Sequence, residues 1–155
     1  MTTGATVTAI SAYLYLKKEK DTRFGIYADD NGEPSTLLGQ TDLVELAQGT
    51  GWRSIDLQHP VNLLPGEYWL AAGLKRDVAL HFDHHGGQTR LGDVDPRDGM
   101  MAEWTETYGP DPNERRISIR AEYTETDFAA GRRVVLPWGG NDLDISSLTD
   151  EGKLL

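Results

Sequence analysis

The chain has 155 residues, 38% of them hydrophobic and 26% charged, with a formal net charge of −10 and no cysteine. This length fits one domain with its own core, and the composition is that of a globular protein, neither disordered nor membrane-spanning. The lack of cysteine excludes disulfides, thiol catalysis and zinc–thiolate sites, and the acidic balance opposes binding to nucleic acid or to anionic lipid.

Alternating apolar residues predict two strands near the N-terminus. Side chains two positions apart share one face of a strand. In residues 6–16 that face holds Ile10, Ala12, Leu14 and Leu16, and in residues 23–28 it holds Phe24 and Ile26. The intervening "KKEKDT" predicts a charged turn. The lysines follow the apolar stretch, the reverse of a secretory signal, so we expect synthesis in the cytosol without export.

The cluster Asp29, Asp30 and Asn31 follows the second strand and precedes Gly32 and Pro34. Asn and Gly tolerate positive φ, and Asp side chains satisfy nearby backbone N–H groups, so the pattern predicts a hairpin turn. A structural calcium ion is the alternative, because loop carboxylates and carbonyls are its ligands. No other cofactor is expected.

Further strands are predicted along the middle of the chain. Residues 36–46 form an extended stretch broken by Gly39, and residues 52–58 form a strand with Ile55 and Leu57 on one face. The prolines and the Pro-Gly pair in residues 59–67 predict turns. Residues 78–82 are expected to continue a hairpin from the strongest predicted strand, whose inner face is Tyr68, Leu70, Ala72 and Leu74.

A long polar, Gly-rich loop over residues 83–99 precedes the closing elements. Residues 100–108 are weakly strand-like, and "RRISIRAEYT" predicts a closing strand. Its inward residues are expected to be Ile117, Ile119, Ala121 and Tyr123, and its outward residues Arg116, Ser118, Arg120 and Glu122. About eight or nine short strands with regular turns predict an all-β fold, an antiparallel β-sandwich.

The last part of the chain lacks the regular alternation of apolar and polar residues seen before it. We expect residues 1–126 to form the sandwich domain and residues 127–155 an extended C-terminal arm, with one strand over residues 133–136 and a short terminal helix over residues 147–155. The arm packs either on its own domain or on a neighbouring subunit or partner. The apolar residues proposed for docking are Val134, Leu136, Trp138, Leu143, Ile145, Leu148, Leu154 and Leu155.

Three segments together resemble a known module. "TVTAISAYLY" is followed by "RFGIYADDNGEPSTLLGQT" and then by "GWRSIDLQHPVNLLPGEYWLAAGL". This order is similar to the jelly-roll β-sandwich modules of phage virion proteins and of bacterial surface and carbohydrate-active multidomain proteins. The resemblance spans roughly residues 5–125 and implies a jelly-roll fold. It implies no activity, because the matching positions are strand and turn residues.

Candidate binding sites are few. His81, Asp83 and His85 alternate on one strand face, a spacing that suits a divalent metal but is also typical of a polar strand end. Trp104 and Tyr108, beside the polar loop, are the candidate glycan platform, with core packing as the alternative for Trp104.

Other residues suggest no chemistry. Trp52 and Trp69 lie in predicted strands and are expected to be structural. The serines lack a nucleophile elbow and no phosphate-binding loop occurs, so the chain is not expected to be an enzyme.

Two functions of different class remain. The first is a structural virion protein, a capsid decoration or tail-fibre module attached to other virion proteins or to copies of itself through the arm, with a homotrimer favoured. The second is a carbohydrate-binding module that uses Trp104, Tyr108 and the loop over residues 81–99. The first places the protein in a virion, and neither involves nucleic acid or membrane.

Overall fold

The structure, a computed structural model, describes residues 4–74, 78–80, 82–83, 89–90, 95–104, 116–126, 133–135 and 142–144. These residues contain twelve strands and one 3₁₀ turn, η1 (Pro96–Asp98). The predicted all-β class is confirmed. Ten of the strands lie within residues 4–126, more than the eight or nine predicted for the sandwich, because several span only two or three residues. Within the described residues, no helix is long and apolar enough to cross a bilayer.

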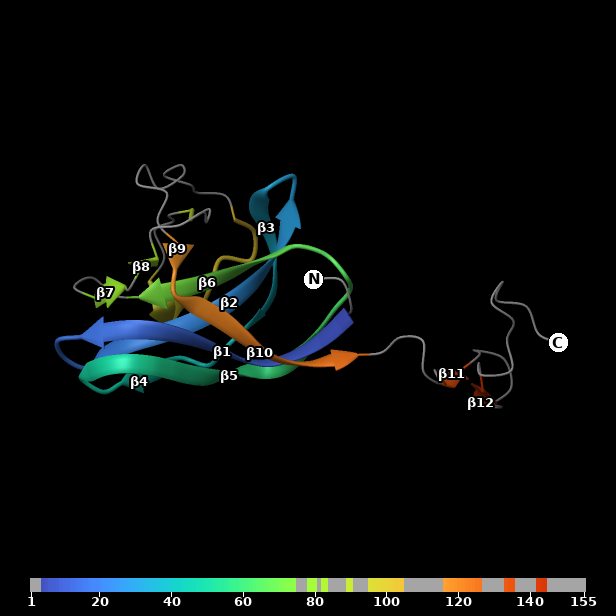
Figure 1. Cartoon of the computed structure of the whole chain (residues 1–155), viewed down its shortest axis with the longest axis horizontal. Coiled ribbons are helices and arrows are strands. Elements are labelled where there is room, and N and C mark those ends of the chain that lie inside the picture. The colour runs from blue at the N-terminus through green and yellow to red at the C-terminus, as the bar shows by residue number, and fades with distance from the viewer. Residues whose placement is uncertain are drawn as a thin grey trace.

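The first sheet is built on β1 (Gly4–Leu16), which pairs antiparallel with three strands (Figure 1). Strand β5 follows one edge of β1 along most of its length, so the other two strands share the opposite edge. The partners are β5 (Gly49–Leu63), β7 (Val78–Leu80) and β10 (Ile119–Thr126).

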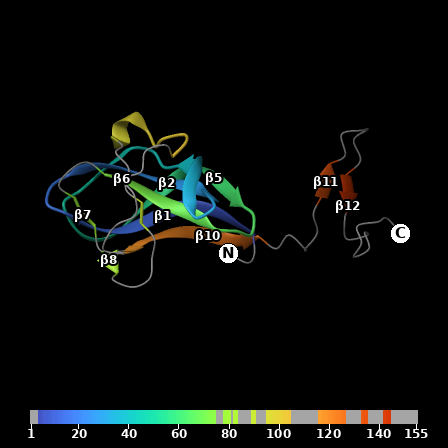
Figure 2. The same cartoon turned by 90° about the horizontal axis from the view of Figure 1, so that it is seen from above.

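The second sheet is built in the same way on β2 (Lys20–Asp30). Strand β6 pairs with Thr22–Ala28 of β2, so β3 and β4 share the other edge. The partners of β2 are β3 (Glu33–Gln40), β4 (Val44–Leu46) and β6 (Tyr68–Leu74). The two sheets face each other as a sandwich (Figure 2), and the finer prediction of jelly-roll connectivity stays a prediction.

Two short pairs complete the described strands. Strands β8 (Phe82–Asp83) and β9 (Arg116–Ile117) form one antiparallel pair. Strands β11 (Arg133–Val135) and β12 (Asp142–Asp144) form another, drawn in Figure 1 beyond the end of β10. One strand was predicted in this C-terminal segment. The pairing shows a second, which its two acidic residues obscured in the sequence.

The core lies between the sheets and is formed by the predicted apolar stripes. Burying these side chains on both inner faces supplies the main driving force for folding. The fully buried members include Ile10, Leu14, Leu16, Phe24 and Ile26, each at most 1% exposed. The predicted inner face of β6 packs against this cluster from the second sheet, through Tyr68, Leu70, Ala72 and Leu74.

A register shift at Thr8 explains why β1 contributes more to the core than its alternation predicts. Val7 pairs with Val61, whereas Ala9 pairs with Asp56, so four residues of β5 lie opposite Thr8. The irregularity changes the parity of β1, and Val7 and Ile10 both face the core although they are three positions apart.

The same shift corrects the predicted end of β5. Pro60 was expected to end the strand in a turn, but β5 continues to Leu63. Because Pro60 lies in the part of β5 that does not pair with β1, its missing N–H removes no bond from that ladder.

Two further expectations are corrected by the pairing. Strand β7 does not extend a hairpin from β6, because it pairs with Leu14–Leu16 of β1 in the other sheet. Tyr123, expected to face inward, is 52% exposed, and it pairs with Val7 at the point where the register between β1 and β10 shifts. Ile119 and Ala121 pack on the core as predicted.

Gly39 lies inside β3 and does not break it, contrary to expectation. A Cβ atom at Gly39 would lie 2.4 Å from Cγ2 of Val61. The glycine is therefore needed for the close approach of β3 to β5, and the strand ends just before Thr41, which forms an isolated bridge with Leu57.

We expect Gly39→Ala to lower the free energy of unfolding by about 1–3 kcal/mol, because the added methyl overlaps Val61. Urea unfolding measures the change. Gly66→Ala is the matched control, since a Cβ there meets only ordinary contacts at 3.6 Å. The double variant Gly39→Ala/Val61→Ala should lose less than the sum of the single losses, and simple additivity would contradict the proposed overlap.

Candidate functional site

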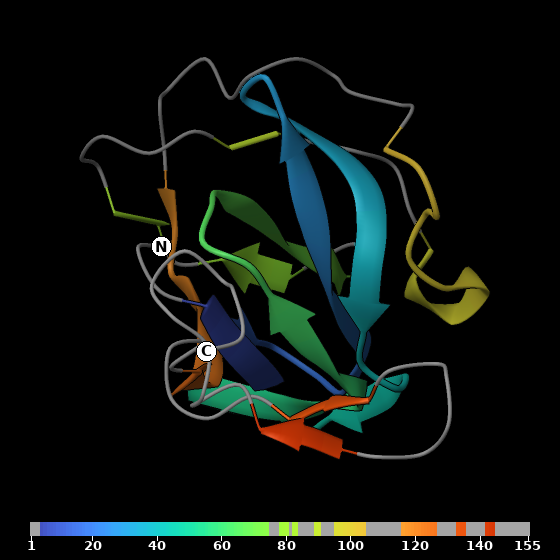
Figure 3. The same ribbon diagram turned by 90° about the vertical axis from the view of Figure 1, so that its right-hand side faces the viewer.

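The outer faces of the two sheets differ, and the difference locates the candidate site. Residues 95–101 lie on the outer face of the second sheet, where Figure 3 shows η1 beside the β2–β3 hairpin, and residues 102–104 hydrogen-bond to the edge of β3. Arg23 Nε donates to the carbonyl of Pro96 at 3.0 Å, and a Cβ at Gly25 would lie 3.3 Å from Met100. The outer face of the first sheet instead carries exposed aromatic side chains.

We define the outer β5–β1–β10 face as the set of neighbouring side chains that point away from the core on these three strands. The register brings it together, because Ser11 pairs with Ser54 on one side and with Arg120 on the other, and Tyr13 pairs with Trp52. The set is Ser11, Tyr13, Tyr15, Trp52, Ser54, Arg120 and Glu122.

The aromatic half of this face is centred on Trp52, which is 43% exposed, and Tyr15 is 41% exposed. The rings of Tyr13 and Trp52 meet edge to face, with centroids 5.8 Å apart. The Arg120 guanidinium lies over the Trp52 ring, with Cζ 4.3 Å from its centroid. This is a cation–π contact, which fixes the plane of the guanidinium group.

The polar half is centred on Glu122. Its Oε1 accepts a hydrogen bond from Ser54 Oγ at 2.8 Å and another from the Ser11 hydroxyl. These two bonds, together with the nearby charge of Arg120, hold the pKa of the Glu122 carboxyl below its usual value. Glu122 is therefore ionised at neutral pH.

Hydrogen-bonding capacity is left over on this face. Both side-chain bonds to the Glu122 carboxylate end on Oε1, and the Arg120 side chain makes no hydrogen bond to the described residues. The face therefore presents a fixed guanidinium donor, a carboxylate acceptor and exposed aromatic surface side by side. Such a combination binds ligands that offer hydroxyl groups next to apolar C–H surface.

The tight turn predicted at the acidic cluster is confirmed, with Asp29 and Asp30 at the end of β2 and Asn31 and Gly32 in the turn. Asn31 has φ 56° and Gly32 has φ 83°, the pair of positive angles that a tight two-residue hairpin requires. Asp29 Oδ2 accepts the Gly32 N–H at 3.0 Å, and Asp29 Oδ1 accepts Trp69 Nε1–H at 2.6 Å. The first bond closes the turn, and the second ties the hairpin to β6. Within the described residues, no group of three metal-ligating side chains occurs.

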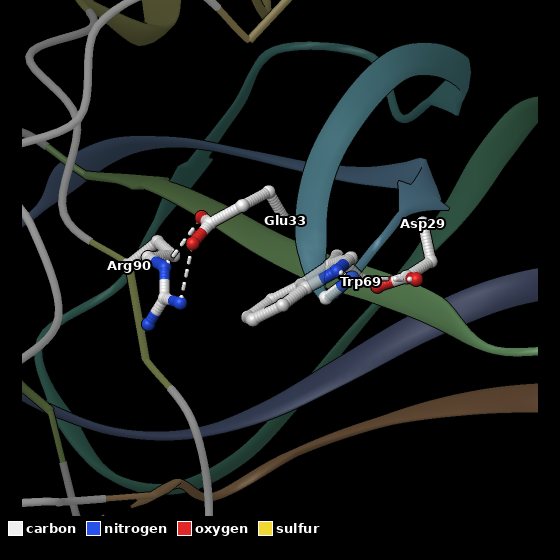
Figure 4. A network of polar contacts seen from close by, with 5 residues as sticks. Asp29, Glu33, Trp69 and Arg90 are labelled. Atoms are coloured by element: carbon white, nitrogen blue, oxygen red, sulfur yellow. Dashed lines mark hydrogen bonds and ion pairs between the residues drawn. The ribbon is translucent and has the colours of Figure 1, made fainter.

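A second network extends from this turn to Arg90 (Figure 4). Arg90 Nε and Nη2 each donate to a Glu33 carboxylate oxygen at 2.6 Å, and Cζ of Arg90 lies 5.6 Å from the Trp69 ring centroid. The hydrogen bond from Arg90 lowers the pKa of Glu33. The network fastens the chain around Arg90 to the β2–β3 hairpin, which is a structural task, and Trp69 has the structural role expected of it.

Trp104, one half of the predicted glycan platform, lies on the covered face of the second sheet. Its ring packs edge to face on Tyr27, with centroids 5.3 Å apart, and its Nε1 atom is buried. Its backbone N–H donates to the Ser35 carbonyl at 2.9 Å. These are packing contacts. Tyr108 lies outside the described residues, so a platform of Trp104 and Tyr108 stays a prediction.

The remaining predicted residues are described only in part. His81 and His85 lie outside the described residues, and Asp83 is described only as part of the backbone of β8. Val134 lies in β11 and pairs with Leu143 in β12. The remaining residues predicted for docking lie outside the described part of the chain. They are Leu136, Trp138, Ile145, Leu148, Leu154 and Leu155.

Sequence analysis missed the outer β5–β1–β10 face, although the alternation contained a signal for it. Trp52 and Ser54 have the opposite parity to Ile55 and Leu57, so Trp52 had to face outward once Ile55 faced inward. Trp52 was expected to be structural instead. Alternation along one strand does not predict which residue of a strand two places away in the sheet lies beside Trp52. Here that residue is Arg120 on β10.

Comparison with models of known families, with curated proteins and with solved structures finds no match. The resemblance to jelly-roll modules therefore rests on the sequence motifs alone.

Burial raises the pKa of Tyr27 to about 12, and its hydroxyl donates to the Met101 carbonyl at 2.8 Å. Because the folded pKa is above the unfolded value of 10.0, Tyr27 contributes stability that is complete below pH 10 and is lost as pH rises toward 12. We expect Tyr27→Phe to lower the free energy of unfolding at pH 7 by about 1 kcal/mol.

Urea midpoints between pH 8 and about pH 11 check this expectation, since the alkaline range is where tyrosine ionises. The Tyr27→Phe midpoint should fall less with rising pH than that of the wild type. Tyr15→Phe is the matched control, because it removes the same hydroxyl from a side chain that is 41% exposed. Equal slopes for the wild type and Tyr27→Phe would contradict the assignment.

Proposed function

We propose that the chain is a non-enzymatic structural or assembly protein, a phage virion component such as a capsid decoration or tail-fibre module, attached through residues 127–155. The observation that carries the proposal is the β11–β12 pair, which forms a sheet of its own. A two-stranded ladder is at best marginally stable in water, and each of these strands has three residues.

The sequence of this segment suggests how the ladder is stabilised. Val134 and Leu143 pair directly, and residues 136–155 add further apolar residues. A neighbouring protein surface would bury these apolar residues. Exchange of the segment between symmetric copies of the chain would supply such a surface. A homo-oligomer, with a trimer favoured, or attachment to another virion protein follows from the proposal, and so does location in the virion.

Electrostatics support a role without catalysis or nucleic acid. Hydrogen bonds to Glu33 and to Glu122 lower the pKa of each of these carboxyl groups. A general acid needs the opposite shift. The net charge of −10 repels phosphate backbones.

Carbohydrate recognition is the second candidate function. The observation that favours it is the outer β5–β1–β10 face, where Trp52 is 43% exposed beside Arg120 and Glu122. The two functions involve different parts of the chain, so one module could perform both.

The attachment proposal predicts that Val134→Asp/Leu143→Asp will convert an oligomer of the full-length chain into monomers, because two charges are introduced into the apolar pair. Light scattering after size-exclusion chromatography measures the mass, which is 17.2 kDa for one chain.

Ser146→Asp/Ser147→Asp is the matched control, since it adds the same charge to polar positions of the same segment. It should leave the oligomer intact. A wild-type chain that is monomeric alone and in the presence of purified particles would refute the attachment proposal.

A further inference from the structure

We propose that the outer β5–β1–β10 face is a binding site for a neutral carbohydrate, with Arg120 and Glu122 sharing neighbouring hydroxyl groups of one sugar ring and Trp52 supplying the aromatic surface. This inference rests on the second candidate function, carbohydrate recognition. It places the site on the opposite sheet from Trp104.

The positions of the polar groups support a ligand rich in hydroxyls. A sugar hydroxyl is both a donor and an acceptor, so two adjacent hydroxyls can accept from a guanidinium and donate to a carboxylate at once. The Arg120 side chain makes no hydrogen bond to the described residues, and both bonds to the Glu122 carboxylate end on Oε1. These groups are therefore ready to accept such a ligand.

The face is also preorganised, which lowers the entropic cost of binding. Arg120 is stacked on Trp52 at 4.3 Å, and Tyr13 supports the Trp52 ring from the side at 5.8 Å. Glu122 is held by the hydroxyls of Ser11 and Ser54. The side chains that would contact the ligand are thus fixed before it arrives.

Charge selects a neutral ligand over a charged one. An anionic sugar would meet the ionised Glu122 and the field of a chain with net charge −10. A cation would meet Arg120, which already occupies the Trp52 ring at the distance of a cation–π contact. A neutral sugar ring avoids both penalties, and its C–H groups match the aromatic surface of Tyr15 and the part of Trp52 that stays exposed beside Arg120.

Binding is tested with the full-length chain on an array of neutral and sialylated oligosaccharides, followed by titration calorimetry with the best neutral probe. Lactose and sialyllactose provide a pair that differs in charge. We expect binding to neutral probes and at least about tenfold weaker binding by each of Trp52→Ala, Arg120→Gln and Glu122→Gln, because each removes one partner of the sugar.

Two variants serve as matched controls. Tyr123→Ala removes an aromatic ring that is 52% exposed on β10 but lies outside the proposed set, and Arg53→Gln removes an arginine from the other side of β5. Both should bind like the wild type. Urea unfolding verifies that all five variants are folded.

Different failures have different meanings. If no neutral probe binds the wild type, carbohydrate recognition itself is overturned. If a probe binds but the three face variants bind as the wild type does, the function holds and this site is wrong. If Trp52→Ala instead turns an oligomer into a monomer and no glycan binds, the face is an interface between copies and the proposal is overturned.

Discussion

Strand β1 has hydrogen-bonded neighbours on both edges, and the rest of the sandwich depends on this position. Its inward side chains belong to the core between the sheets, whereas its outward side chains Ser11 and Tyr13 lie in the middle of the outer β5–β1–β10 face. Both sets are fixed by one backbone, so the packing that stabilises the fold also aligns the outer residues. The register shift at Thr8 is what lets the whole strand contribute to the core.

The second sheet uses its outer face differently. The outer side of β2 is formed by Arg23, Gly25, Tyr27 and Asp29. The first three contact residues 96–101, and Asp29 binds Trp69, whose ring lies against Arg90. These contacts bury the outer face, which explains why Tyr27 has a raised pKa. Among the described residues, the segment that covers a sheet lies on the second one, and the outer β5–β1–β10 face carries the exposed side chains Trp52 and Tyr15.

Local sequence rules predicted which side chains point inward and where the tight turn lies, because both depend on residues that are neighbours in the chain. The stripe from Ile10 to Leu16 and the Asn31–Gly32 turn are examples. They failed at Gly39, where the constraint comes from Val61 on another strand. They also failed at Trp52, whose partner Arg120 lies two strands away, since strand order across a sheet is not encoded in alternation.

The two proposed functions meet in strand β10. Arg120 and Glu122, the polar half of the outer face, lie on β10, and this strand ends at Thr126, directly before the segment proposed for attachment. Because β10 is hydrogen-bonded to β1 over most of its length, residues 127–155 continue directly from a strand of the first sheet. A module attached through residues 127–155 would carry the outer β5–β1–β10 face on the sheet from which the attached segment continues. The register of that sheet would hold the binding side chains of this face in place.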